Sequence, residues 1–98
     1  MKAIKVNSEN EILCPVCGGN FLHHSSVNVF TRDSEDGPGT SALSTHEGIS
    51  ITRKDDKEIY GRRDAIQIEF WCESCGENAS PKRLIINQHK GNTLIQWL

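Results

Sequence analysis

The four cysteines of the chain, arranged as two short pairs, constrain its fold more than any other feature. Cys14 and Cys17 are separated by two residues, Cys72 and Cys75 repeat that spacing, and a glycine directly follows each pair. This spacing lets backbone N–H groups point back at the first sulfur, and the glycine allows a positive φ at little cost. Each pair is therefore typical of a chelating turn, and the two pairs together offer four thiolates.

Four thiolates form the complete ligand set of a closed structural zinc site. A Zn²⁺ ion bound by four cysteine sulfurs at about 2.3 Å is tetrahedral and has no open position for a substrate. We predict one structural Zn²⁺ held by Cys14, Cys17, Cys72 and Cys75. We do not expect an enzyme, because no nucleophile, base and orienting group can be identified together. The 54 residues between the pairs, positions 18 to 71, should carry structure of their own.

Other uses of the same residues stay open at the level of sequence. Four cysteines can form two disulfides or remain as four buried thiols, and a C-x-x-C pair can also be redox-active. A thioredoxin-like redox pair normally stands alone at the start of a helix in a βαβ unit, whereas here there are two pairs and no helical periodicity. His23 and His24 could replace or supplement a sulfur ligand, or be ordinary strand residues. His46 and His89 are too scattered to specify a second site.

Length and charge limit the classes of protein to which the chain can belong. Its 98 residues predict a single domain over residues 1–98, with a core small enough for a metal to be a plausible staple. The net charge of −2 gives no overall attraction to nucleic acid or to an anionic membrane. No run approaches the ~20 apolar residues that span a bilayer, and the first residues have no apolar run of the signal-peptide type. We expect a cytoplasmic protein that does not contact membranes.

Alternation of apolar and polar residues predicts a mainly β fold with antiparallel strands. The clearest strand is Ala65–Cys72, in which alternation places Ile66, Ile68, Phe70 and Cys72 on one face, expected to be the core side. Further strands are predicted at Val27–Phe30 and Gly48–Arg53. Toward the end of the chain, residues 83–88 and 93–97 flank His89-Lys90-Gly91-Asn92, which predicts a β-hairpin with a short turn.

Residues 31–47 have a different composition. Acidic residues are combined there with glycine, proline and serine, as in Asp33-Ser34-Glu35-Asp36-Gly37-Pro38-Gly39. This mixture favours turns over strands. We therefore predict a mobile, exposed acidic loop over residues 31–47.

A resemblance can be stated on these residues. The segments Cys14-Pro15-Val16-Cys17-Gly18-Gly19 and Trp71-Cys72-Glu73-Ser74-Cys75-Gly76 resemble the paired knuckles of zinc-ribbon proteins. The whole chain is also similar to small uncharacterised bacterial and phage- or plasmid-borne zinc-ribbon proteins, through Glu69-Phe70-Trp71-Cys72 and Gln88-His89-Lys90-Gly91. The resemblance implies a small antiparallel zinc ribbon with two zinc knuckles, an inserted β/loop segment and a C-terminal β-hairpin. It implies no activity.

Two functional classes follow. Because zinc ribbons often serve in transcription, translation and replication, the first is a nucleic-acid-associated module or an accessory regulator of transcription. Its candidate contacts are the basic residues Arg62, Arg63, Lys82, Arg83 and Lys90, which could instead form a solvated rim. Trp71, Trp97, Phe30 and Tyr60 could stack on bases or belong to the core.

The second class is a protein–protein interaction module. Zinc would rigidify a small scaffold, and the hairpin, the acidic loop or an edge strand would recognise a protein. If the gene is carried by a mobile element, the partner would be host machinery. No small-molecule substrate is expected. A contiguous basic face would favour nucleic acid, whereas an exposed apolar patch would favour a protein.

Overall fold

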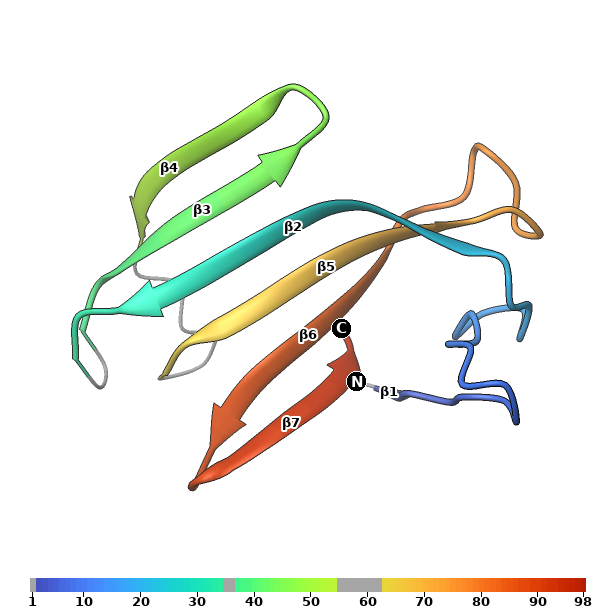
Figure 1. Cartoon of the computed structure of the whole chain (residues 1–98), viewed down its shortest axis with the longest axis horizontal. Helices are drawn as coiled ribbons and strands as arrows, with labels where there is room; N and C mark the ends of the chain where they lie inside the picture. Colours follow the sequence, from blue (N-terminus) through green and yellow to red (C-terminus); the bar gives the residue numbers. More distant parts are fainter. Residues whose placement is uncertain (1, 35–36, 55–62) are drawn as a thin grey trace.

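The structure is a computed structural model that describes residues 2–34, 37–54 and 63–98, and these form one open antiparallel sheet (Figure 1). The strand order is β1-β7-β6-β5-β2-β3-β4. The strands are β1 (Lys2–Ala3), β2 (Leu22–Arg32), β3 (Gly39–Thr45), β4 (Gly48–Lys54), β5 (Ala65–Cys72), β6 (Lys82–His89) and β7 (Asn92–Trp97). The described residues contain no helix, and so none that could cross a membrane, which confirms the prediction of a mainly β fold.

The centre of the sheet is the antiparallel pair β2 and β5. Both strands are rich in β-branched and aromatic residues, which suit a pleated and half-buried backbone. Leu22 pairs with Cys72 at one end and Phe30 pairs with Ala65 at the other, with a β-bulge between His24 and Ser26. We call these the knuckle end and the turn end of the sheet. The pairing brings the segment that precedes β2 beside the segment that follows β5.

The C-terminal hairpin is confirmed. Strands β6 and β7 pair from Leu84 with Trp97 to His89 with Asn92. The two residues between them, Lys90 and Gly91, have φ values of 51° and 82°. Two positive φ values in a two-residue loop indicate a type I′ turn, whose twist matches that of the flanking strands.

The predicted exposed loop over residues 31–47 was wrong for most of its length. Strand β2 continues to Arg32 and strand β3 begins at Gly39, so the connection between them covers only positions 33–38. The glycine at 39 serves close packing rather than a turn, because a Cβ there would lie 2.8 Å from Cζ of Phe30. Gly39 and Ala42 of β3, which have a weak strand preference, lie between β2 and β4, where ladder pairing on both sides offsets that preference.

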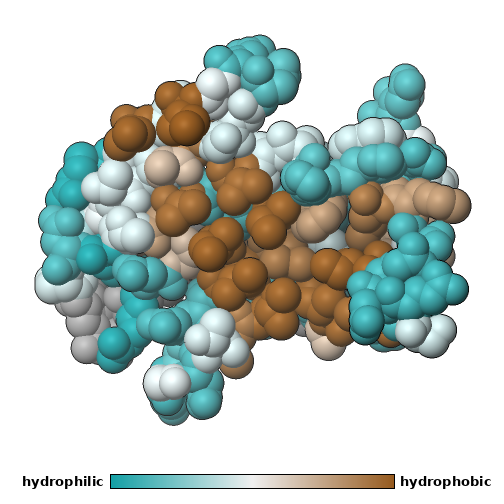
Figure 2. Space-filling view, in the orientation of Figure 1, coloured by the Kyte–Doolittle hydropathy of each residue, from teal (hydrophilic) through white to brown (hydrophobic). Residues whose placement is uncertain are grey.

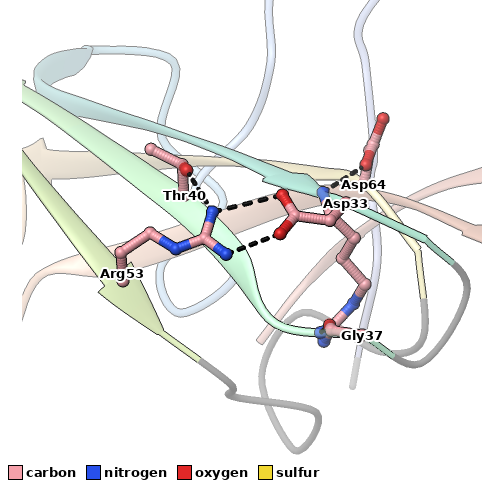
Figure 3. Close-up of polar contacts among 6 residues, drawn as sticks. Asp33, Gly37, Thr40, Arg53 and Asp64 are labelled. Carbon is pink, nitrogen blue, oxygen red and sulfur yellow. Dashed lines mark hydrogen bonds and ion pairs between the residues drawn. The ribbon is translucent and has the colours of Figure 1, made fainter.

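Polar contacts join this connection to the neighbouring strands (Figure 3). The Arg53 guanidinium donates to both carboxylate oxygens of Asp33, at 2.6 and 3.1 Å, and to the hydroxyl of Thr40 at 2.9 Å. Next to it the Arg32 backbone N–H donates to a carboxylate oxygen of Asp64 at 2.8 Å. Asp33, an acidic residue of this connection, is thus the ion-pair partner of Arg53 on β4.

The strand register divides the sheet into two faces of different character. Directly paired residues lie on the same face, so the register links two rows of side chains across six strands. One row is Ile51, Ala42, Val29, Ile66, Ile86 and Ile95, and the other is Ile49, Ser44, Val27, Ile68, Leu84 and Trp97. We call this side the apolar face. The space-filling view shows hydrophobic residues gathered in one band across the sheet (Figure 2).

The most buried cluster lies on the other side, which we call the opposite face. It consists of Phe30, Ala65 and Ile85. Beside it, the buried hydroxyl of Ser41 donates to the side-chain oxygen of Asn28 at 2.7 Å. The sequence correctly predicted that Ile66, Ile68 and Phe70 share a face, but that face is not the side of this cluster, and Ile66 is 37% exposed.

The apolar face is covered only toward the knuckle end. Leu84 and Trp97 are buried there, and the rings of Trp97 and Phe70 meet edge to face, with centroids 5.6 Å apart. The N-terminal segment contributes a tight turn next to this region, closed by a bridge between Val6 and Ile12. The packed interior of the described residues is therefore split between the knuckle end of one face and the middle of the other.

Candidate metal centre

The first cysteine pair lies in the connection between β1 and β2. The Cys14 N–H donates to the Gly19 carbonyl at 2.8 Å, and the Gly18 N–H donates to the Cys14 carbonyl at 3.0 Å. Gly18 has a φ of 76°, as predicted for the glycine after the pair. The N–H of Val16 points at Sγ of Cys14 and that of Gly19 at Sγ of Cys17, each at 3.4 Å. These N–H···S contacts are the expected geometry of a chelating turn.

The second pair begins at the last residue of β5. Cys72 ends the strand, and Gly76, directly after Cys75, has a φ of 91°. The Glu73 N–H donates to the carbonyl of Phe21 at 3.1 Å, which fixes the second turn to the residue before β2. Ligands far apart in the chain are therefore brought together by the central strand pair rather than by either turn alone.

The four sulfurs have the spacing of a tetrahedral metal site. All four Sγ atoms lie within 4.8 Å of one another. Sγ of Cys14 is 3.8 Å from that of Cys75, and Sγ of Cys17 is 3.6 Å from that of Cys72. A regular tetrahedron with metal–sulfur bonds of about 2.3 Å has edges of about 3.8 Å. A disulfide would need an S–S distance of about 2.05 Å, and all four cysteines are free. The predicted ligand set is thus brought together at one point.

The electrostatics of the cluster also fit a bound cation. Burial raises the pKa of Cys14, but N–H groups of Cys17 and Val16 outweigh it and lower that pKa to about 7. At Cys75, burial and then the neighbouring sulfurs raise the pKa to about 12. Sulfurs this close cannot all be thiolates unless a cation lies among them. The residues present therefore fit a divalent ion with tetrahedral sulfur coordination.

The two neighbouring histidines are engaged outside the cluster. Nε2 of His23 lies 2.7 Å from a carboxylate oxygen of Glu73, and its ring stacks on Trp71 with centroids 4.3 Å apart. The ring of His24 meets Phe70 at an edge, 6.5 Å between centroids. Among the described residues, the metal-sized cluster consists of the cysteines alone. The His23–Glu73 contact was missed by the sequence analysis, because it depends on the pairing of β2 with β5.

The predicted basic residues divide between the two ends of the sheet. Lys82 and Arg83 begin β6 at the knuckle end, where Lys82 is only 8% exposed and Nε of Arg83 lies 3.6 Å from a Glu69 oxygen. Lys90 lies in the β6–β7 turn and Arg63 just before β5, both at the turn end. Arg62 lies outside the described residues. The four described residues therefore do not form one patch.

The aromatic residues also separate into two groups. Phe30 and Trp97 are buried, whereas Trp71 is exposed on its stack with His23. Tyr60 lies outside the described residues. The interpretation of these aromatics as core residues therefore holds for Phe30 and Trp97 and not for Trp71.

Comparison with known proteins finds no counterpart: no protein-family model matches the chain, and no curated protein or solved structure matches it. The resemblance to zinc ribbons consequently rests on the cysteine motifs, and the metal centre rests on the geometry of its four sulfurs.

Proposed function

We propose that the chain is a zinc-stabilised protein-interaction module. Zn²⁺ is favoured among divalent ions because four cysteine thiolates in a tetrahedron are its usual structural site, and the observed sulfur spacing fits its bond length. The thiolates would fill every coordination position, so the ion would hold the fold and would not bind a substrate. It would join the loop before β2 to the end of β5.

The apolar face is the observation that carries the interaction function. Ile49 and Ile51 on β4 are 71% and 70% exposed, and Ile95 on β7, near the other edge of the sheet, is 51% exposed. Domains normally bury the apolar side of a sheet against a second layer. Among the described residues, no second layer covers this face away from the knuckle end, where Leu84 and Trp97 are buried. A protein partner would supply that second layer, and the metal would keep the sheet rigid enough to present its apolar face.

A nucleic-acid partner, or a role as an accessory regulator of transcription, is the second candidate. The exposed stack of Trp71 on His23 favours it, because aromatic side chains can hold unpaired bases. Carboxylates adjoin the stack, since Glu73 contacts His23 and Glu69 lies near Arg83. Affinity for phosphates grows with the number of cations that reach them. Because carboxylates adjoin the stack and would repel phosphates, we prefer a protein partner to a nucleic-acid partner.

The metal part of the proposal is tested by Cys72→Ser, with Ser74→Ala as the matched control in the same turn. Loss of one thiolate should abolish stoichiometric zinc binding and lower the stability to unfolding, because metal binding and folding are coupled. The control should bind one zinc and unfold as the unmodified protein does. Full zinc content in Cys72→Ser would contradict the four-sulfur site.

The interaction part is tested by placing a photo-crosslinking amino acid at position 51 or at position 52. Ile51 lies on the apolar face, whereas Thr52 pairs with Ser41 on the opposite face, and both are exposed. Irradiation of the organism that carries the gene should give a discrete protein adduct from position 51 and none from position 52. Equal or absent adducts from both positions would contradict the apolar face as the recognition surface.

The nucleic-acid alternative has its own test. Single-stranded oligonucleotides are titrated into the zinc-loaded protein between about 50 and 200 mM salt, a range over which phosphate contacts weaken steeply. Binding that falls steeply with salt and is lost in Trp71→Ala would favour nucleic acid. If no oligonucleotide binds at the lower salt concentration, the nucleic-acid alternative is excluded and a protein partner is the remaining candidate.

A further inference from the structure

One row of the apolar face is open to solvent from one side of the sheet to the other. It runs along paired residues of six strands, from Ile51 on β4 to Ile95 on β7. Val29 and Ile66, from the two central strands, are still 41% and 37% exposed. Exposure is therefore not confined to the edges, and the middle of the sheet itself has no cover among the described residues.

The size of this surface suits a small protein contact. Strands lie about 4.8 Å apart and alternate residues of one strand about 6.7 Å apart. Two rows across six strands would occupy roughly 400 Å², of which roughly 300 Å² is open, because Leu84 and Trp97 are already buried. The third row on the same face adds the polar residues Thr40 and Thr31, directly paired between β3 and β2. An apolar centre with a polar rim of roughly 200 Å² brings the area to roughly 500 Å² per partner, near the roughly 600 Å² at the lower end of standard interfaces.

The distribution of charge indicates which partner fits. The two rows contain one polar residue, Ser44, and no charged residue. Charges on this face lie at its margins: Lys2 on edge strand β1 pairs in register with Trp97 and donates to the Pro15 carbonyl, Arg53 toward the turn end is ion-paired with Asp33, and Lys82 at the knuckle end is nearly buried. Such a surface has no charge with which to select an oppositely charged partner, and two copies of it meet without like-charge repulsion.

We propose that the partner of the apolar face is a second copy of this chain, packed face to face about a two-fold axis. This inference rests on the proposed function, because it names the occupant of the same surface. The two sheets lie about 10 Å apart as a sandwich with aligned strands, and the same residues of each copy meet across the axis. The central strands β2 and β5 lie at the middle of the contact, so Val29 and Ile66 are its most deeply buried residues.

The test compares two lysine substitutions at residues of nearly equal exposure. Ile66→Lys introduces a charge on the apolar face, where the side chain is 37% exposed. Leu94→Lys introduces the same charge on the opposite face, because Leu94 pairs with Asn87 and is 38% exposed. Both are assayed as the zinc-loaded full chain by sedimentation equilibrium over a concentration series.

The unmodified protein and Leu94→Lys should reach twice the chain mass of 11.0 kDa. Ile66→Lys should stay monomeric, with a dissociation constant raised at least about 100-fold by burial of an unpaired charge. If Ile66→Lys fails to keep its zinc or its strand circular dichroism, Ile95→Lys replaces it. Ile95 is adjacent to the control position, lies on the apolar face and is far from edge strand β4.

Two results would overturn the face-to-face dimer. A dimer that persists in Ile66→Lys would show that the copies meet elsewhere, for example by pairing of their β4 edges. An unmodified protein that stays monomeric at about 100 μM, well above typical dissociation constants of specific dimers, would exclude the second copy. Crosslinking from position 51 then separates the two ideas: an adduct with a different protein preserves the proposed function, and no adduct overturns both.

Discussion

Truncation of Ile85 probes the buried cluster of the opposite face. The Ile85 side chain is fully buried against Phe30 and Ala65. Ile85→Ala removes three carbons, worth about 0.8 kcal/mol each in transfer free energy, and leaves a cavity that the neighbouring strands cannot fully close. We expect the free energy of unfolding to fall by about 3.5 kcal/mol. Because one kcal/mol shifts the melting temperature of a domain this size by about 4–8 °C, the transition should fall by more than 10 °C.

Leu43→Ala is the matched control, because it removes the same number of carbons from the same face. Leu43 is 39% exposed, so its truncation loses part of the transfer term and leaves no closed cavity. Leu43→Ala should therefore lower the free energy of unfolding by about 1.5 kcal/mol or less. Both variants are compared with the unmodified protein by urea unfolding, followed by tryptophan fluorescence at saturating zinc and one fixed protein concentration. Equal costs for the two variants would refute the assignment of the buried cluster. If Ile85→Ala does not fold, Ile85→Val should still cost about 1 kcal/mol.

Three further predictions concern the connections. Gly39→Ala should destabilise the protein by about 1–3 kcal/mol in urea unfolding, because the new methyl group would meet the Phe30 ring and the Thr31 carbonyl; an unchanged midpoint would show that β3 can shift. Lys90→Asn should stabilise it by about 0.5 kcal/mol, since asparagine accepts the positive φ of a type I′ turn more readily than lysine; a lowered melting temperature would argue against that turn. Asp33→Asn should change stability little, because its ion pair with Arg53 is exposed. Arg53 lowers the pKa of Asp33, so any stabilisation by this ion pair should be present above pH 3.8, the ordinary pKa of an aspartate. It should be lost as the pH falls through the lowered pKa. A difference in stability between Asp33→Asn and the unmodified protein that grows on acidification would contradict this sign.

The parts of the fold that sequence predicted well are those set by local chemistry. Both cysteine turns could be recognised because the spacing and the following glycines fix their backbone, as the φ values of Gly18 and Gly76 show. Strand β5 and the C-terminal hairpin were predicted because alternation and a glycine-containing turn are short-range signals. Convergence of the two turns followed from the need for four ligands at one ion.

The parts that sequence did not predict depend on contacts between distant segments. Composition alone suggested a loop over residues 31–47, because it cannot show that β2 and β4 pair with β3 on both sides. The same holds for Gly39, whose role is the close approach of Phe30. Alternation in β5 identified two faces but not which of them is covered, since that depends on strand order across the whole sheet. The apolar face emerged only from the combined register of six strands.

The four-cysteine zinc centre is tested most directly by the metal content of the purified full chain, measured by native mass spectrometry before and after treatment with a chelator. We expect one zinc ion per chain, with the four cysteines reduced, and loss of strand circular dichroism when the ion is removed. A chain without metal, a mass lowered by the hydrogens of two disulfides, or a fold that survives chelation unchanged would contradict a four-cysteine zinc centre that holds this sheet together.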